Sequence, residues 1–256
     1  YRMDGVKRES KTAGTNRAGG VLVYYHLKDE PKEELRIEFY DNNKNLLREF
    51  SSKGIEKDTL KYKTGSNEFN WNLRIPDAKS FEGMIMWGGP LRGPKVVPGD
   101  YTVKLIVDGK TEEQSFKVLA DPRYESSQED LLAQYDFLLN VRDKLTETHE
   151  TIIIIRKYRD ELNALVEKDP KKKRRIEPIV NAISDIEKEL YQTQNRSGQD
   201  PLNFPIRLNN KLAHLNAVVG NGDYRPTAGA EEVKVEISGL IDVQLKKFRE
   251  IESSQI

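Results

Sequence analysis

Acid–base and metal chemistry in proteins rest mainly on histidines and paired carboxylates. The chain has three histidines, His26, His149 and His214, which lie far apart in the sequence. None stands in the spacing of a metal-ligand motif, so we interpret all three as structural or surface residues. Carboxylates abound on polar faces, but no pair is distinguished as an acid and a base. There is no Ser-His-Asp spacing, and the glycines at 88–94 precede no helix, which excludes a phosphate loop. We therefore predict no catalytic, metal-binding or cofactor-binding residue.

Aromatic side chains are the other informative group, because exposed rings can form a platform for sugars. The candidates for such a platform are Trp71, Trp87, Tyr24, Tyr25 and Phe81. We favour a different interpretation, a β core plus a loop anchor, because Trp71 alternates with other apolar residues as a core strand residue does. In the Gly- and Pro-rich segment that follows, the candidate ligand or interface residues are Trp87, Phe81, Met84 and Met86.

Charge and composition limit the kinds of partner. Lys plus Arg and Asp plus Glu both number 42 among 256 residues, so the net charge is zero, and there is no cysteine. A balanced charge argues against a general nucleic-acid binder, and the lack of cysteine excludes disulfides and thiolate chemistry. No stretch approaches the roughly 18 apolar residues of a membrane span. The basic run from Lys171 to Arg175 fits a solvated loop partnered by Glu187, Glu189 or a neighbouring domain, with binding to an anionic surface or nucleic acid as the alternative.

The hydrophobic pattern of residues 19–122 is that of short strands. Period-2 alternation predicts strands near 21–27, 34–40, 46–50, 67–73, 100–108 and 113–119. Asp108-Gly109 favours a tight hairpin turn between the last two. Short strands without a helix signal are typical of an immunoglobulin-like β-sandwich. The polar residues 1–18 are interpreted as an entry linker, with a short strand near Tyr1 to Met3.

The period changes at Asp121-Pro122, and residues 123–256 follow a helical pattern. Ser127 is a suitable N-cap for a helix that extends to about Lys168. Apolar residues at spacings of three and four predict three more helices, near 176–190, 205–219 and 228–252. Four amphipathic helices on short connections imply an antiparallel bundle. The expected fold is therefore α+β and two-domain, a sandwich followed by a helical bundle.

Three stretches resemble one family. These are WNLRIPDA…FEGMIMWGGPLRGPKVVPGDYTVKLIVDGK, AGGVLVYYHLKD at 18–29, and PLNFPIRLNNKLAHLNAVVGNGDYRPTAGAEEVKVEI at 201–237. They resemble the region just after the β-propeller in bacterial sortilin-like, BNR-repeat proteins labelled "glycosyl hydrolase". The PGDYTVKLIVDGK hairpin is also similar to flagellar-hook-type immunoglobulin-like domains, at the level of fold.

This resemblance implies a non-catalytic accessory region of an exported, periplasmic or extracellular protein. Its partner would be the upstream propeller, which it buttresses, with other proteins or glycans as further partners. A carbohydrate-binding module is the alternative and requires exposed coplanar aromatics. A hydrolase in its own right is the second alternative and requires two convergent carboxylates in a cleft.

The junction between the two halves is the last expectation. The segment 81–97 carries more apolar side chains than a free loop exposes. We predict that it packs against one face of the first helix and that Trp87 is buried in that contact.

Overall fold

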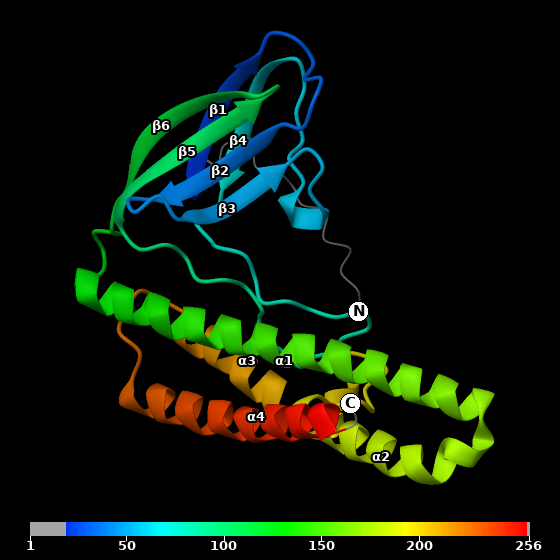
Figure 1. Ribbon diagram of the computed structural model, residues 1–256. Helices are drawn as coiled ribbons and strands as arrows, with labels where there is room; N and C mark the ends of the chain where they lie inside the picture. The colour runs from blue at the N-terminus through cyan, green and yellow to red at the C-terminus, as the bar shows by residue number, and fades with distance from the viewer. Residues whose placement is uncertain (1–18, 255–256) are drawn as a thin grey trace, which may run out of the picture.

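The structure of the protein is a computed structural model that describes residues 19–254. The predicted entry linker and the short strand near Tyr1 lie outside the described residues. The described chain is α+β, with six strands in its first half and four α-helices in its second (Figure 1).

The six strands form two antiparallel sheets. β1 (Val21–Leu27) pairs with β4 (Gly65–Trp71), and the second sheet has the order β3 (Leu46–Ser51), β2 (Arg36–Asp41), β5 (Gly99–Val107), β6 (Lys110–Val118). β5 and β6 are joined by the two residues Asp108 and Gly109, both at positive φ, as a tight hairpin requires. The strands and this turn confirm the predicted pattern to within a few residues, and a single 3-10 turn, η1 (Glu56–Asp58), is the one helical element among them.

Side chains from both sheets meet in one apolar cluster. Trp71 of β4 is fully buried and stacks on Phe39 of β2, with ring centroids 4.2 Å apart. Phe69 contacts Phe50 of β3 in the same cluster, at 4.6 Å between centroids. Burial of these large rings stabilises this half, because apolar burial contributes about 25 cal/mol per Å².

The helices are α1 (Gln128–Lys168), α2 (Lys173–Leu190), α3 (Leu208–Val219) and α4 (Ala228–Ser254). Ser127 and Asp130 form a reciprocal capping box at the start of α1, which confirms the predicted cap. Two short 3-10 turns, η2 (Pro170–Lys172) and η3 (Asp200–Leu202), lie in the connections. All four helices contribute to a second apolar core, in which Val141, Ile155, Ile183, Leu212 and Ile241 are fully buried.

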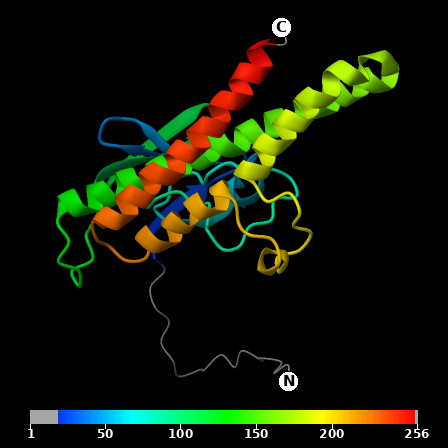
Figure 2. The same cartoon turned by 90° about the horizontal axis from the view of Figure 1, so that it is seen from below.

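Helix α1 is the element that joins the two halves. Figure 1 shows it between the sheets on one side and α3 and α4 on the other. Its 41 residues correspond to about 60 Å at 1.5 Å per residue, so it is long enough to underlie the β half and continue past it. Figure 2 shows the α1–α2 turn projecting beyond α3.

Candidate functional site

The segment between β4 and β5, residues 72–98, runs from the sheets to the helices and back (Figure 1). We call it the docking loop. It has no strand or helix of its own, and its bends use glycines at positive φ, at Gly83, Gly88 and Gly89. Its apolar side chains Phe81, Met84, Met86 and Leu91 pack against the helical core. The loop therefore does hold the junction, as the sequence suggested.

Phe81 is the aromatic anchor of the docking loop. Its ring meets His149 of α1 and Tyr191, after α2, edge to face, with centroids 5.4 Å and 5.0 Å apart. The guanidinium of Arg156 lies over the ring, 4.5 Å from its centroid. Both edge-to-face aromatic contacts and cation–π contacts are favourable in a partly desolvated site. Phe81 is thus bound by two helices at once.

Glu187 fixes the position of Arg156. It is 2% exposed and accepts from Arg156 Nε at 2.7 Å and from Arg159 Nη1 at 2.6 Å. A buried carboxylate requires such partners, since an unpaired buried charge costs several kcal/mol. The suggested pairing of the basic run with Glu187 or Glu189 is wrong, because Glu187 binds these two arginines and Glu189 lies 3.6 Å from Arg207.

His149 connects the docking loop to α3. It is fully buried, and its Nδ1 hydrogen-bonds the carbonyl oxygen of Lys79. A carbonyl only accepts, so Nδ1 carries the proton, and Nε2 is left to accept from Asn209 Nδ2 at 3.1 Å. Burial lowers the pKa of His149, while the Lys79 carbonyl opposes this by favouring the protonated ring. The arrangement holds a neutral imidazole of one tautomer as a structural residue.

Asparagines of α3 bind the main chain of the docking loop. Asn210 accepts from the Trp87 backbone N–H at 2.7 Å and donates to the Trp87 carbonyl at 2.9 Å. Asn216 donates to the carbonyl of Arg92 at 2.7 Å. These side chains add to the backbone hydrogen bonds that join the two arms of the loop, such as Ala78 N–H to the Leu91 carbonyl at 2.8 Å.

Trp87 is held by its backbone and not by burial of its indole. Its side chain is 39% exposed, and it is absent from the residues that pack on the helical core. The expectation that Trp87 is buried at the junction was therefore wrong, because Asn210 satisfies its backbone and leaves the ring at the surface. The junction is held by Phe81, Met84 and Met86 instead, on α1, α2 and α3 rather than on α1 alone.

The five aromatics considered for a sugar platform do not form one surface. Trp71 is fully buried and donates its indole N–H to the Arg74 carbonyl at 3.0 Å. Phe81 packs on the helices, whereas Tyr24 of β1 is 68% exposed. The core interpretation of Trp71 is confirmed.

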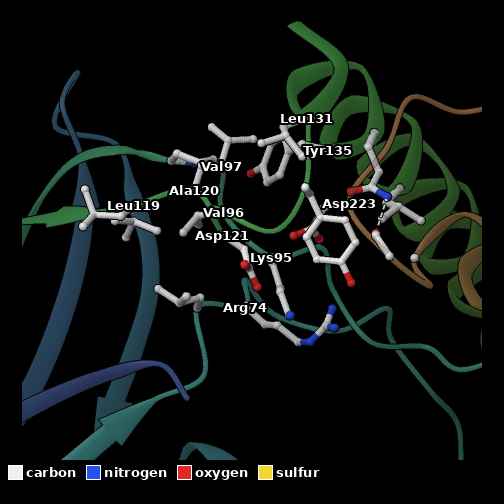
Figure 3. A pocket seen from close by; sticks show the side chains of 18 of the residues that line it. Arg74, Lys95, Val96, Val97, Leu119, Ala120, Asp121, Leu131, Tyr135 and Asp223 are labelled. Carbon is white, nitrogen blue, oxygen red and sulfur yellow. Dashed lines mark hydrogen bonds between the residues drawn. The ribbon is translucent and has the colours of Figure 1, made fainter. Parts of the chain in front are cut away.

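A cavity of about 410 Å³ lies between the β half and the start of α1 (Figure 3). Its apolar lining comes from both halves and includes Val96, Val97, Leu131 and Tyr135. Arg74, Lys95, Asp121 and Asp223 add charge around it, as Figure 3 shows. Gln134 closes one side by donating to the carbonyls of Val219 and Gly222 at 2.7 and 2.8 Å.

The charges around this cavity do not favour Asp121 as a general acid or base. Hydrogen bonds from the Arg123 side chain and backbone lower the pKa of Asp121 to about 2, so it stays ionised at neutral pH and cannot donate a proton. Burial raises the pKa of Tyr135, which keeps the phenol neutral.

Across residues 19–254, no group of three or more His, Asp and Glu side chains is placed to hold a metal ion. None of the helices in that range combines the length and apolarity needed to cross a bilayer. The basic run lies on η2 and the start of α2, exposed on the projecting turn, and no ion pair found within the described residues includes it. Family models, curated proteins and solved structures were compared with this chain, and none matches.

Sequence reasoning missed Asn209, Asn210 and Asn216, the asparagines that fix the loop. All three are nearly fully buried, whereas the sequence analysis considered only the apolar residues of this helix. Asn209 and Asn216 are seven residues apart, so they repeat on one face of the helix. Amides that recur on an apolar face were the available signal for a bound backbone segment.

Proposed function

We propose that this chain is a non-catalytic accessory region of an exported BNR-repeat propeller protein. In this proposal residues 19–122 form an immunoglobulin-like sandwich and residues 123–256 an antiparallel four-helix bundle. The region buttresses the propeller and offers surfaces for protein contacts. The resemblance of three stretches of the sequence to that family supports the context.

The observation that carries the proposal is the docking loop. It contacts three helices through Phe81, His149 and Asn210, and in this proposal these contacts make the sheets and helices one rigid body. A rigid body of this kind can brace another domain, whereas two flexibly linked domains cannot. The loop also presents the half-exposed indole of Trp87 on a fixed backbone, and tryptophan is enriched among the residues that dominate interfaces.

The test begins with the gene that encodes this chain, which is sequenced upstream of the codon for Tyr1. Propeller repeats are expected there; any other sequence would end the proposal. The propeller is then produced with and without residues 1–256, and its thermal melting is compared. The midpoint should rise when the region is present, because a partner that binds only the folded state stabilises it.

Point variants then locate the contact. Trp87→Ala should weaken binding of the separate region to the propeller by tenfold or more, in line with a loss of about 2 kcal/mol at an interface hot spot. Tyr62→Ala is the matched control, because Tyr62 is 36% exposed but lies on the β half away from the docking loop. Equal effects of the two changes would show that the contact does not involve Trp87.

A further inference from the structure

A second cavity, of about 370 Å³, lies among β3, the end of β4 and the docking loop. Four cationic side chains line it, Arg48, Lys57, Arg74 and Arg92, against the single carboxylate of Asp77. The chain as a whole has zero net charge. The excess of positive charge is therefore a local feature of this cavity, and low-dielectric walls concentrate its field.

Two of the four cations are already neutralised. Arg48 is paired with Asp58, and Lys57 is paired with Asp77. Asp77 is also engaged by the docking loop, because its Oδ1 accepts from the Gly93 backbone N–H at 2.9 Å. The only carboxylate in the lining is thus committed on both oxygens, and it acts on Arg74 through space without an ion pair.

Arg74 and Arg92 are the two remaining cations. Neither forms an ion pair with a carboxylate of residues 19–254. Arg74 donates Nη1 to the Gly93 carbonyl at 2.7 Å, which fixes one arm of its guanidinium and leaves other donors unused. Burial lowers the pKa of Arg74, the nearby charge of Arg92 lowers it further, and the charge of Asp77 opposes both effects. Both guanidinium groups line the same cavity, and guanidinium groups bind oxyanions through charge-assisted hydrogen bonds.

A third donor in the lining is also unsatisfied. The side chain of Arg48 is 7% exposed, and its Nε has no hydrogen-bond partner within the described part of the chain. The Nε atoms of Arg142 and Arg207, which lie outside this cavity, are unsatisfied as well, so Arg48 Nε is an available donor here and not by itself a sign of a ligand.

The remaining lining residues are two aromatic side chains and two asparagines, which we consider as groups that meet a sugar. Phe50 and Phe69 supply an apolar wall, and Asn70 and Asn72 supply amides. The Asn72 oxygen accepts from the Arg74 backbone at 3.1 Å, which directs its amide protons to other acceptors. The Phe50 ring lies under the Arg48 guanidinium and packs on Phe69, so the asparagine amides, and not open ring faces, are the groups available to the hydroxyls of a sugar.

We propose that this cavity binds a sugar acid, with the ligand's carboxylate on Arg74 and Arg92 and its hydroxyls toward the asparagines. The recognition is charge-assisted and bidentate, so it requires the guanidinium groups and not positive charge alone. The site differs from the docking loop's contacts with the helices and is independent of any propeller.

The test is isothermal titration calorimetry of the 256-residue chain with glucuronate and, separately, with glucose, at low ionic strength. Glucuronate should bind, and glucose, which lacks the carboxylate, should bind at least tenfold more weakly. Arg92→Gln should weaken glucuronate binding about tenfold or more, because a charge-assisted hydrogen bond is lost. Arg92 is exposed, so this variant should fold normally. Arg74→Lys keeps the charge but loses the guanidinium group, and it should weaken binding as well.

Lys95→Gln is the matched control. It removes the same charge from the docking loop, but Lys95 lines the cavity between the halves and not this one. An unchanged affinity is expected. No glucuronate binding at millimolar concentration, or equal losses in the Lys95 and Arg92 variants, would overturn the proposal. Equal binding of inorganic sulfate would show an unspecific anion site and overturn the assignment to a sugar acid. Binding of only a carboxylate-rich peptide would replace the small ligand with a protein partner.

Discussion

The buried imidazole of His149 gives the stability of this protein a pH dependence that can be worked out from the structure. Burial lowers its folded-state pKa below the ordinary value of 6.5, and the Lys79 carbonyl only partly offsets this. The native state therefore binds fewer protons than the unfolded state in the range below about pH 6.5. Stability from His149 is fully present above the unfolded pKa and is lost as the pH falls from there toward the folded pKa.

The loss of unfolding free energy at low pH has an upper limit, which is set by the protonation of His149 in the unfolded state. If the native imidazole stays neutral down to pH 5.5, the free energy of unfolding falls by about 1.4 kcal/mol between pH 7.5 and 5.5. Asp121 and Asp130, whose pKa values are lowered to about 2 by hydrogen bonds from Arg123 and from Arg225 and Ser127, contribute only at lower pH. The pH range in which His149 changes the stability is therefore separate from the range in which the two aspartates change it.

The assay is urea unfolding at half-unit steps from pH 7.5 to 5.5, with His149→Asn as the matched variant. Asparagine keeps an N–H donor for the Lys79 carbonyl but does not titrate. The variant should be less stable at pH 7.5 and should lack the His149 contribution to the slope, while His26 and His214 are common to both proteins. Parallel pH dependences of the two proteins would refute the reasoning, because they would show that folding leaves the His149 pKa unchanged.

Two further predictions concern the contacts of the docking loop with the helices. Gly89→Ala should cost about 2 kcal/mol of stability in urea unfolding, because a Cβ at Gly89 would lie 2.8 Å from the Ala213 Cβ. Gly83→Ala is its control, since Gly83 also has positive φ but no atom within 4 Å of an added Cβ, and similar losses in both would assign the cost to φ alone. Glu187→Gln should cost about 2–3 kcal/mol, because Arg156 loses its charged partner beneath Phe81; a melting temperature equal to that of the wild type would contradict this.

Local pattern was sufficient for most of the elements. Period-2 alternation located β1 and β5, the Asp108-Gly109 pair located the hairpin, and Ser127 located the start of α1. Each of these signals depends on residues within one turn or one strand, where sterics, backbone hydrogen bonds and one-sided burial act over short distances. The apolar content of the segment at 81–97 likewise indicated a contact with the helices, although not its form.

Only the tertiary structure determined which side chains join the docking loop to the helices. Trp87 and Phe81 are both aromatic residues of one irregular loop, and nothing in their spacing separates an exposed ring from an anchored one. The difference comes from two residues that are distant in the sequence. Asn210 binds the backbone of Trp87, 123 residues away, and Tyr191 binds the backbone of Ile85, 106 residues away. The cavity at Arg74 and Arg92 also depends on the tertiary structure, because β3 and the loop bring Arg48 to it from a position that is distant in the sequence. Contacts without a local repeat leave no periodic signal, so they follow from the packing of the folded chain and not from the sequence pattern.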